Sequence, residues 1–242
     1  MSPTLLVLFD IDGTLLLDDA YAHGRAMVRS MREVWGVELS DDIVELVEPW
    51  GKTDLQIARA ALATAGIDDT GFRERRGAWI RAAGRAFEDE VQAGADQWRM
   101  RDGLAHALAR LAESGMRLSL VTGNLRPIAE AKVRQMGLFL RFDLAIGAYG
   151  DDAEDRADLV PLARERAGSP DRPWPRHAAV LVGDAPGDVA AARADGVPAV
   201  VFVSPRFTPE ALAGATVVVE DTQDLVDTLL HWKAADTSGG SG

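Results

Sequence analysis

Short apolar runs alternate with amphipathic segments over most of this chain. The apolar runs predict β-strands at Leu5–Phe9, Leu118–Val121, Leu144–Ile146, Ala179–Val182, Ala199–Val203 and Thr216–Val219. Between most of them, helical spacing of apolar residues predicts helices at Leu104–Ser114, Ile128–Met136, Asp158–Ala167, Val189–Ala194 and Leu225–Trp232. Continuous apolar strands that alternate with helices are typical of a parallel sheet covered on both faces. The pattern therefore predicts an α/β fold.

The pattern changes between the first two predicted strands, where only helices are expected. They lie at Ala20–Val34, Asp42–Val47, Leu55–Ala65 and Gly71–Val91. About 80 residues are too many for a single crossover helix. We therefore predict a helical insert at 19–96 over the carboxyl ends of the strands, where ligands bind in open α/β sheets. The core would comprise 1–18 and 97–236, and the Ser/Gly-rich residues 237–242 would form a flexible tail.

The composition narrows the choice of partners and compartment. A net charge of −12 disfavours nucleic acid and anionic membrane surfaces as partners. The absence of cysteine excludes disulfides, thiolate nucleophiles and cysteine-bound zinc. The apolar run at Leu5–Phe9 is too short for a signal peptide, and no run has the roughly 18–20 apolar residues of a membrane span. We expect a cytoplasmic monomer or homodimer with no nucleic-acid or membrane partner.

The first predicted strand ends in two acids, Asp10 and Asp12, followed directly by Gly13 and Thr14. Acids at the tip of a buried strand cost stability unless something pairs with them, and a divalent cation with a phosphate ester would do so. The Asp10 carboxylate could attack phosphorus. Asp12 points the same way in extended chain and could exchange a proton with the leaving alcohol and then with water. A simple Asp-Gly turn is the structural alternative.

Two later predicted strands also end in polar residues. Thr122, Gly123 and Asn124 offer a hydroxyl and backbone N–H groups that suit a phosphate oxygen, although an ordinary helix start would also fit. Asp184, after the fourth predicted strand, could bind Mg²⁺ together with Asp10, since Mg²⁺ prefers oxygen ligands. Asp188 could hold a metal-bound water, orient a basic group, or merely favour the helix N-terminus.

These residues resemble the motifs of the haloacid dehalogenase-like hydrolase superfamily over the whole chain. Its Asp-x-Asp-Gly-Thr motif is met by Asp10–Thr14, its strand ending in Thr or Ser by Thr122, and its Gly-Asp-x-x-x-Asp motif by Gly183–Asp188. The resemblance implies a Rossmann-like core with an inserted helical cap. The most similar branch is phosphoglycolate phosphatase-like, in which a segment like Gly51–Asp54 faces the active site. The candidate substrate-binding residues are therefore Gly13, Thr14, Gly123, Asn124, Lys52 and Thr53.

The resemblance also implies roles for the acids. Asp10 would be the nucleophile and Asp12 the general acid and base. Mg²⁺ would be held by Asp10, Asp184 and the backbone carbonyl of Asp12, with Asp188 as a further metal-site residue. A second acid at position 12 favours phosphatase chemistry, because the dehalogenases of the family attack carbon without a metal.

The third motif departs from the family pattern, which usually has a lysine at the start of the helix before Asp184. Arg156 stands there instead, and as a bidentate cation it could neutralise both phosphate and Asp10. The structural alternative for Arg156 is a surface ion pair with a nearby acid. Lys132 is the rival, but it lies roughly 10 Å along its helix, so its reach is doubtful. We favour Arg156 as the catalytic cation, with Asp10, Asp12 and Thr122.

Several insert residues also have structural interpretations. Thr53 could equally cap the helix that begins at Leu55. We expect the insert to be packed by Trp50, Trp79 and Trp98. His23 and Arg25 are expected on a solvated helix face rather than in a cleft.

The sequence thus predicts a Mg²⁺-dependent phosphatase that hydrolyses a small phosphomonoester, phosphoglycolate-like or a sugar phosphate, through an aspartyl-phosphate. A phosphosugar mutase on the same scaffold and a non-catalytic domain that binds a phosphorylated ligand or a protein are the alternatives. Dehalogenation is a more distant one.

Overall fold

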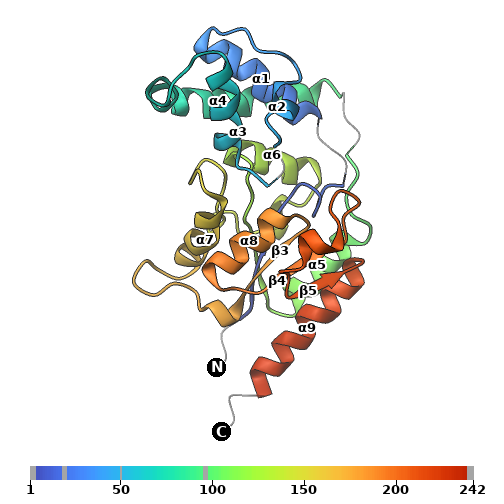
Figure 1. Cartoon of the computed structure of the whole chain (residues 1–242). Helices are drawn as coiled ribbons and strands as arrows, with labels where there is room; N and C mark the ends of the chain where they lie inside the picture. Colours follow the sequence, from blue (N-terminus) through green and yellow to red (C-terminus); the bar gives the residue numbers. More distant parts are fainter. Residues whose placement is uncertain (1–3, 18–20, 50, 95–97, 239–242) are drawn as a thin grey trace.

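A five-stranded parallel sheet forms the centre of the molecule in the computed structural model, which describes residues 4–17, 21–49, 51–94 and 98–238 (Figure 1). Its strands, in the spatial order β2-β1-β3-β4-β5, are β1 (Leu6–Phe9), β2 (Arg117–Leu120), β3 (Ala179–Gly183), β4 (Ala199–Phe202) and β5 (Val217–Val219). Phe9 pairs with Leu120 on one side and with Val182 on the other. This register brings the carboxyl ends of β2, β1 and β3 to the same level.

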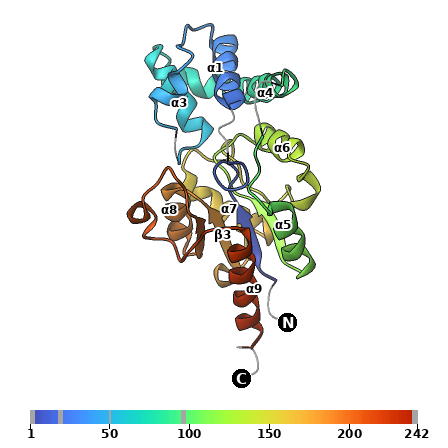
Figure 2. The same ribbon diagram turned by 90° about the vertical axis from the view of Figure 1, so that its right-hand side faces the viewer.

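Helices cover both faces of the sheet because both faces are apolar. The helices of this part are α5 (Leu104–Glu113), α6 (Arg126–Gln135), α7 (Leu159–Ala167), α8 (Pro186–Asp195) and α9 (Thr222–Ser238). Val7 and Phe9 pack with α5, α6 and α9, whereas Leu6 and Leu8 pack with α7 and α8. In Figure 2, α5 and α8 lie on opposite sides of the sheet. The predicted α/β class with a Rossmann-like sheet is confirmed.

The insert forms a second helical body above the carboxyl ends of the strands (Figure 1). It contains α1 (Tyr21–Trp35), α2 (Ile43–Leu46), α3 (Asp54–Thr64) and α4 (Asp69–Gln92). These helices share a core of their own, in which the fully buried Trp79 lies against Trp35 and Phe72. Trp98 contacts Phe87 edge-on and packs against the cores of both bodies. Trp50 lies outside the described residues.

The two chain passages between the bodies run side by side. The Leu17 N–H donates to Arg99 O at 2.9 Å, and the Arg101 N–H donates to Leu15 O at 3.0 Å. The predicted boundaries of the insert, at residues 18/19 and 96/97, fall on or beside residues outside the described ranges and stay predictions.

The predicted strand at Leu144–Ile146 is wrong. Asp143 N–H donates to Leu118 O at 2.8 Å, and Ala148 N–H donates to Leu120 O at 3.0 Å. The chain therefore advances five residues here while β2 advances two, and the intervening segment bulges away from the strand. The Tyr149 hydroxyl donates to Leu144 O and stabilises this bulge.

The carboxyl-terminal helix is longer than predicted. Helix α9 continues to Ser238 and so includes Thr237 and Ser238 of the predicted tail, while residues 239–242 lie outside the described part. Across the described ranges, no helix is both long and apolar enough to cross a membrane.

Candidate active site

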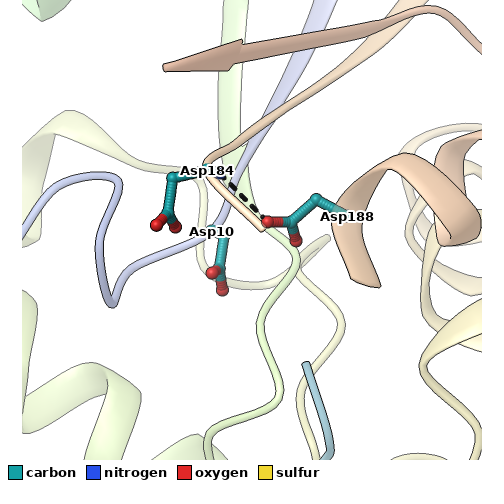
Figure 3. A group of neighbouring side chains, drawn as sticks. All are labelled: Asp10, Asp184 and Asp188. Atoms are coloured by element: carbon teal, nitrogen blue, oxygen red, sulfur yellow. Dashed lines mark hydrogen bonds between the residues drawn. The ribbon is translucent and has the colours of Figure 1, made fainter. Parts of the chain in front are cut away.

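A cavity of about 330 Å³, open to solvent on one side, lies between the carboxyl edge of the sheet and the insert. Asp10 follows β1 directly and Asp184 follows β3 directly, so the register of the sheet brings them together. Asp188 lies on the first turn of α8 and points toward both (Figure 3). One carboxylate oxygen from each of the three acids lies within 4.8 Å of the others. Residues more than 170 positions apart thus form one acidic cluster.

Burial dominates the electrostatics of this cluster. Asp10 is only 5% exposed, and burial raises its pKa to about 7, with neighbouring carboxylates adding to the rise and Arg156 opposing it. The pKa of Asp184 is raised to about 6, first by burial and then by Asp188. Clustered acids that resist ionisation are stabilised by a cation, and an all-carboxylate donor set suits Mg²⁺. The residues present therefore fit the predicted metal.

Gly13 and Thr14 shape the turn that holds Asp184. Gly13 has φ +83°, and a Cβ there would overlap the Asp184 carboxylate, so the close approach requires glycine. The Thr14 hydroxyl donates to Asp184 Oδ1 at 3.3 Å. Both were predicted to bind substrate, but the cavity lining does not include them. Their observed contacts orient Asp184 instead.

Arg101, which sequence reasoning missed, holds the same turn from the returning chain. Its guanidinium donates to Thr14 O at 2.8 Å and to Gly13 O at 2.5 Å, and it stacks 3.8 Å from the Phe202 ring centroid. No local motif marks this arginine, because its partners are backbone carbonyls brought near by the fold.

Asp188 orients a basic group, one of its three predicted roles. Its Oδ2 accepts from the backbone N–H groups of Asp184 at 3.1 Å and Ala185 at 3.0 Å, which caps α8. Its Oδ1 pairs with the Arg156 guanidinium. Both oxygens are thus engaged, which fixes Arg156 beside the cluster.

Arg156 enters the cavity from the 3₁₀ turn Arg156–Asp158, just before α7. Its Nη2 lies 3.1 Å from Asp10 Oδ1, and only 8% of the residue is exposed. The alternative of a surface ion pair is wrong, since the nearby Asp152 and Glu154 pair with Arg166 and Arg59. Within the described residues the buried Arg156 Nε–H meets no acceptor. An N–H in this position is available to an anion or a water in the cavity.

Lys132 also reaches the cavity, so the prediction that it lies too far along its helix to do so is wrong. It is fully buried, and its Nζ lies 2.7 Å from both oxygens of Asp12, 2.6 Å from Asn124 Oδ1 and 3.2 Å from His23 Nδ1. Lys132 lies about 9 Å along α6 from its first residue, Arg126, but long side chains of a helix point back toward its N-terminus. That direction carries the ammonium group to the strand ends.

His23 connects this lysine to the insert, which contradicts its predicted place on a solvated face. Its side chain is 15% exposed, and its Nε2 lies 3.0 Å from Asp54 Oδ2. Because the Lys132 ammonium can only donate, His23 Nδ1 accepts and Nε2–H donates to Asp54. Asp54 Oδ2 also accepts from Leu125 N–H at 2.7 Å. Arg25 does lie outside, where it pairs with Glu90.

Asp12 differs from Asp10 in its charge state. Burial acts to raise its pKa, but Lys132, His23 and Asn124 outweigh burial and lower the pKa to about 2. Asn124 Nδ2 donates to Asp12 Oδ2 at 2.7 Å. Two carboxylates two residues apart thus have pKa values that are far apart, as expected where they have different chemical roles.

Of the remaining predicted site residues, some line the cavity and others only contact neighbouring residues. Gly123, Asn124 and Lys52 line the cavity, although Lys52 Nζ donates to Val47 O at 2.5 Å. Thr122 does not line it, and its hydroxyl accepts from Asn124 Nδ2 at 2.9 Å. Thr53 caps α3 and donates to the Glu154 carbonyl at 2.8 Å, so the structure favours its capping role over substrate binding.

The arrangement is that of an enzyme with an acidic site at the edge of a Rossmann-like sheet, and comparison with known proteins supplies the family. Residues 4–196 match the family description "haloacid dehalogenase-like hydrolase". The chain belongs to this family, as its motifs predicted.

A curated relative, a phosphoglycolate phosphatase from Rhodospirillum rubrum, is 31% identical over 233 residues, which cover 92% of this chain and 90% of that protein. The predicted class, a phosphoric monoester hydrolase, is confirmed at this level.

Solved structures share the fold. CbbY from Rhodobacter sphaeroides, in complex with phosphate, is 23% identical with a TM-score of 0.64 and covers 92% of this chain and 96% of its own. A hydrolase from Pseudomonas syringae is 21% identical with a TM-score of 0.64, and the match covers 94% of this chain and 99% of that one. At these identities the likeness concerns the fold alone.

Proposed function

We propose that the protein is a Mg²⁺-dependent phosphatase that hydrolyses a small phosphomonoester through an aspartyl-phosphate on Asp10. The observation that carries this proposal is the position of Arg156 in the cavity. It holds the candidate nucleophile at 3.1 Å and keeps a buried N–H without an acceptor among the described residues. A phosphoryl oxygen would satisfy that N–H next to the attacking carboxylate.

The residues of this chain divide the reaction between them. An Asp10 oxygen forms the new P–O bond while the ester P–O bond breaks, and the leaving alcohol takes a proton from Asp12. Water then attacks the aspartyl-phosphate, its proton passes to Asp12, and Asp10 and inorganic phosphate are released. Asp12, with a pKa of about 2, is ionised at neutral pH, and a bound phosphate would raise this pKa toward the proton-carrying form. Arg156 and the backbone around Gly123 bind the transferring group.

Asp10 and Asp184, with the backbone carbonyl of Asp12, would hold Mg²⁺. The ion would neutralise the acids and the charge that develops on the phosphoryl oxygens. Asp188 would act through Arg156 and the α8 N-terminus rather than as a direct ligand, since both of its oxygens are engaged. The insert would serve as a cap that excludes water.

A phosphate-release assay on p-nitrophenyl phosphate tests the function. We expect turnover with Mg²⁺ and its loss in EDTA, with recovery when Mg²⁺ is restored. Isomerised sugar phosphate without free phosphate would favour the mutase. Halide released from a 2-haloacid without metal would favour the dehalogenase. A protein that binds phosphate esters with Mg²⁺ yet converts none would refute the enzyme mechanism.

Mg²⁺ should stabilise the protein more at pH 8 than at pH 5. The raised pKa values of Asp10 and Asp184, about 7 and about 6, mean that the folded protein binds protons more tightly than the unfolded chain. The free energy of unfolding of the metal-free protein therefore falls as pH rises from about 4 to about 7. Mg²⁺ competes with those protons, so the increase in Tm on its addition should grow across this range. Equal increases at both pH values would contradict the metal site.

Lys132→Met should lower kcat about 10- to 100-fold, because Asp12 loses its main cation and its pKa rises. The free energy of unfolding should fall by about 2–3 kcal/mol, since His23 and Asn124 lose the same partner. A pH profile of kcat should show its acidic limb at higher pH. Lys233→Met on α9 is the control. A profile identical to that of the unchanged protein would remove Lys132 from the mechanism.

We further propose a small phosphorylated metabolite as the ligand and the cytoplasm as the location. The metabolite is supported by the size and charge of the cavity.

A further inference from the structure

Apolar side chains of the insert form part of the cavity wall. Met27 from α1, Val44 from α2 and Ile57 from α3 line it, together with Pro49 from the segment after α2. Met27, Val44 and Ile57 also belong to the insert core, which holds them in place. A leaving group that extends from a phosphate at Asp10 toward the insert would therefore meet carbon.

Three of the polar side chains on the insert side already have partners. His23 uses both ring nitrogens, Asp54 accepts from His23 and Leu125, and Lys52 donates to the Val47 carbonyl. Within the described residues these contacts leave Asp54 Oδ1 and two N–H groups of Lys52 for a ligand, which is fewer groups than a sugar has hydroxyls. A sugar would bury several hydroxyls here without partners, which is unfavourable.

Two lining residues of the insert have no side-chain partner among the described residues: Tyr21 at the start of α1, and Glu45, whose charge disfavours an acidic leaving group. Glu45 lies on α2, lines the cavity and is exposed, and in the described part of the chain it pairs with no cation. A glycolate carboxylate that pointed toward the insert would meet this negative charge. Two cationic residues also line the cavity: Lys52, whose Nζ donates to the Val47 carbonyl, and Arg206, which lies on the core side at an exposed position.

We propose that the preferred substrate is a phosphomonoester of an uncharged, largely apolar alcohol, alkyl or arylalkyl, larger than glycolate. This inference rests on the proposed phosphatase function and narrows its substrate class. A cavity of about 330 Å³ lies at the lower end of the range for small-molecule sites and leaves room for such a group beside the phosphate.

The first test compares benzyl phosphate and n-hexyl phosphate with glucose 6-phosphate and 2-phosphoglycolate in the presence of Mg²⁺. Alkyl esters are used because an aryl ester would react faster through its better leaving group alone. We expect kcat/KM for the apolar esters to be at least about tenfold higher. Faster release from glucose 6-phosphate or 2-phosphoglycolate would overturn the substrate class and leave the phosphatase standing. No release from any ester would overturn both.

Two variants locate the preference in the wall. Val44→Thr keeps the shape but adds a hydroxyl, and it should raise KM for benzyl phosphate about three- to tenfold. Leu46→Thr, on the same helix but 66% exposed and outside the lining, is the matched control. Equal KM values for these two variants would contradict the wall's role.

Glu45→Gln should raise kcat/KM for 2-phosphoglycolate relative to benzyl phosphate by about threefold or more, because a repulsive charge is removed. Glu74→Gln, an exposed change on α4, is its control. An unchanged ratio in Glu45→Gln would overturn the part of the inference that excludes acidic leaving groups.

Discussion

Replacing Asp10 with asparagine is expected to lower phosphate release from p-nitrophenyl phosphate by at least about 10⁴-fold, because an amide cannot form the acyl-phosphate bond. The fold should persist, since the two side chains have nearly the same shape. The Asp10 carboxylate is buried and its pKa is raised to about 7, so at pH 8 the wild-type protein carries an unfavourable charge there. Without Mg²⁺ the variant should therefore unfold at the same or a higher temperature.

Asp89→Asn is the matched control, because Asp89 is 58% exposed in its side chain and pairs with Arg29 on the surface of the insert. Exposed pairs of this kind contribute little, so activity and Tm should stay close to those of the unchanged protein. Calorimetric titration should show weaker Mg²⁺ binding to Asp10→Asn than to the control. Substantial turnover by Asp10→Asn would remove Asp10 as the nucleophile.

Arg156→Met should lower kcat/KM about 10²- to 10³-fold, since a positioned donor to the transferring group is lost. The change also leaves Asp10 and Asp188 without their shared cation. The pKa of Asp10 should then rise above about 7, and the acidic limb of the kcat/KM profile should move to higher pH. The direction follows because Arg156 is the group that lowers this pKa in the folded protein.

Arg156→Lys separates charge from geometry in this position. A lysine restores the charge but not the planar guanidinium, whose Nη2 contacts both Asp10 and Asp188 while its Nε–H stays available to a ligand, so recovery should be partial. Arg59→Met is the control, because Arg59 pairs with Asp69 and Glu154 near the protein surface. If Arg156→Met retains full activity while Lys132→Met loses it, then Lys132 supplies the cation that faces the phosphate.

Much of the fold could be predicted because its signals are local. The apolar runs at β1 and β3 are buried on both faces and are followed directly by Asp10 and Asp184, and β2 leads to Thr122 after Val121. The sheet and its reactive edge therefore follow from the chain alone. The insert was visible because helical spacing persisted where one crossover should have sufficed. The Leu144–Ile146 segment was misassigned because a short apolar run does not reveal the register that a strand needs.

The sequence alone determined which acids stand at the strand ends, because each follows its strand directly and parallel strands meet at one edge. Tertiary structure alone decided which partners the basic side chains contact. Lys132 reaches Asp12 only because α6 docks beneath the insert, and His23 joins Asp54 only because α1 and α3 pack together. Long flexible side chains such as lysine and arginine have many possible partners in sequence, and packing selects one of them. The apolar wall beside Val44 has the same origin, since three helices of the insert must meet to form it.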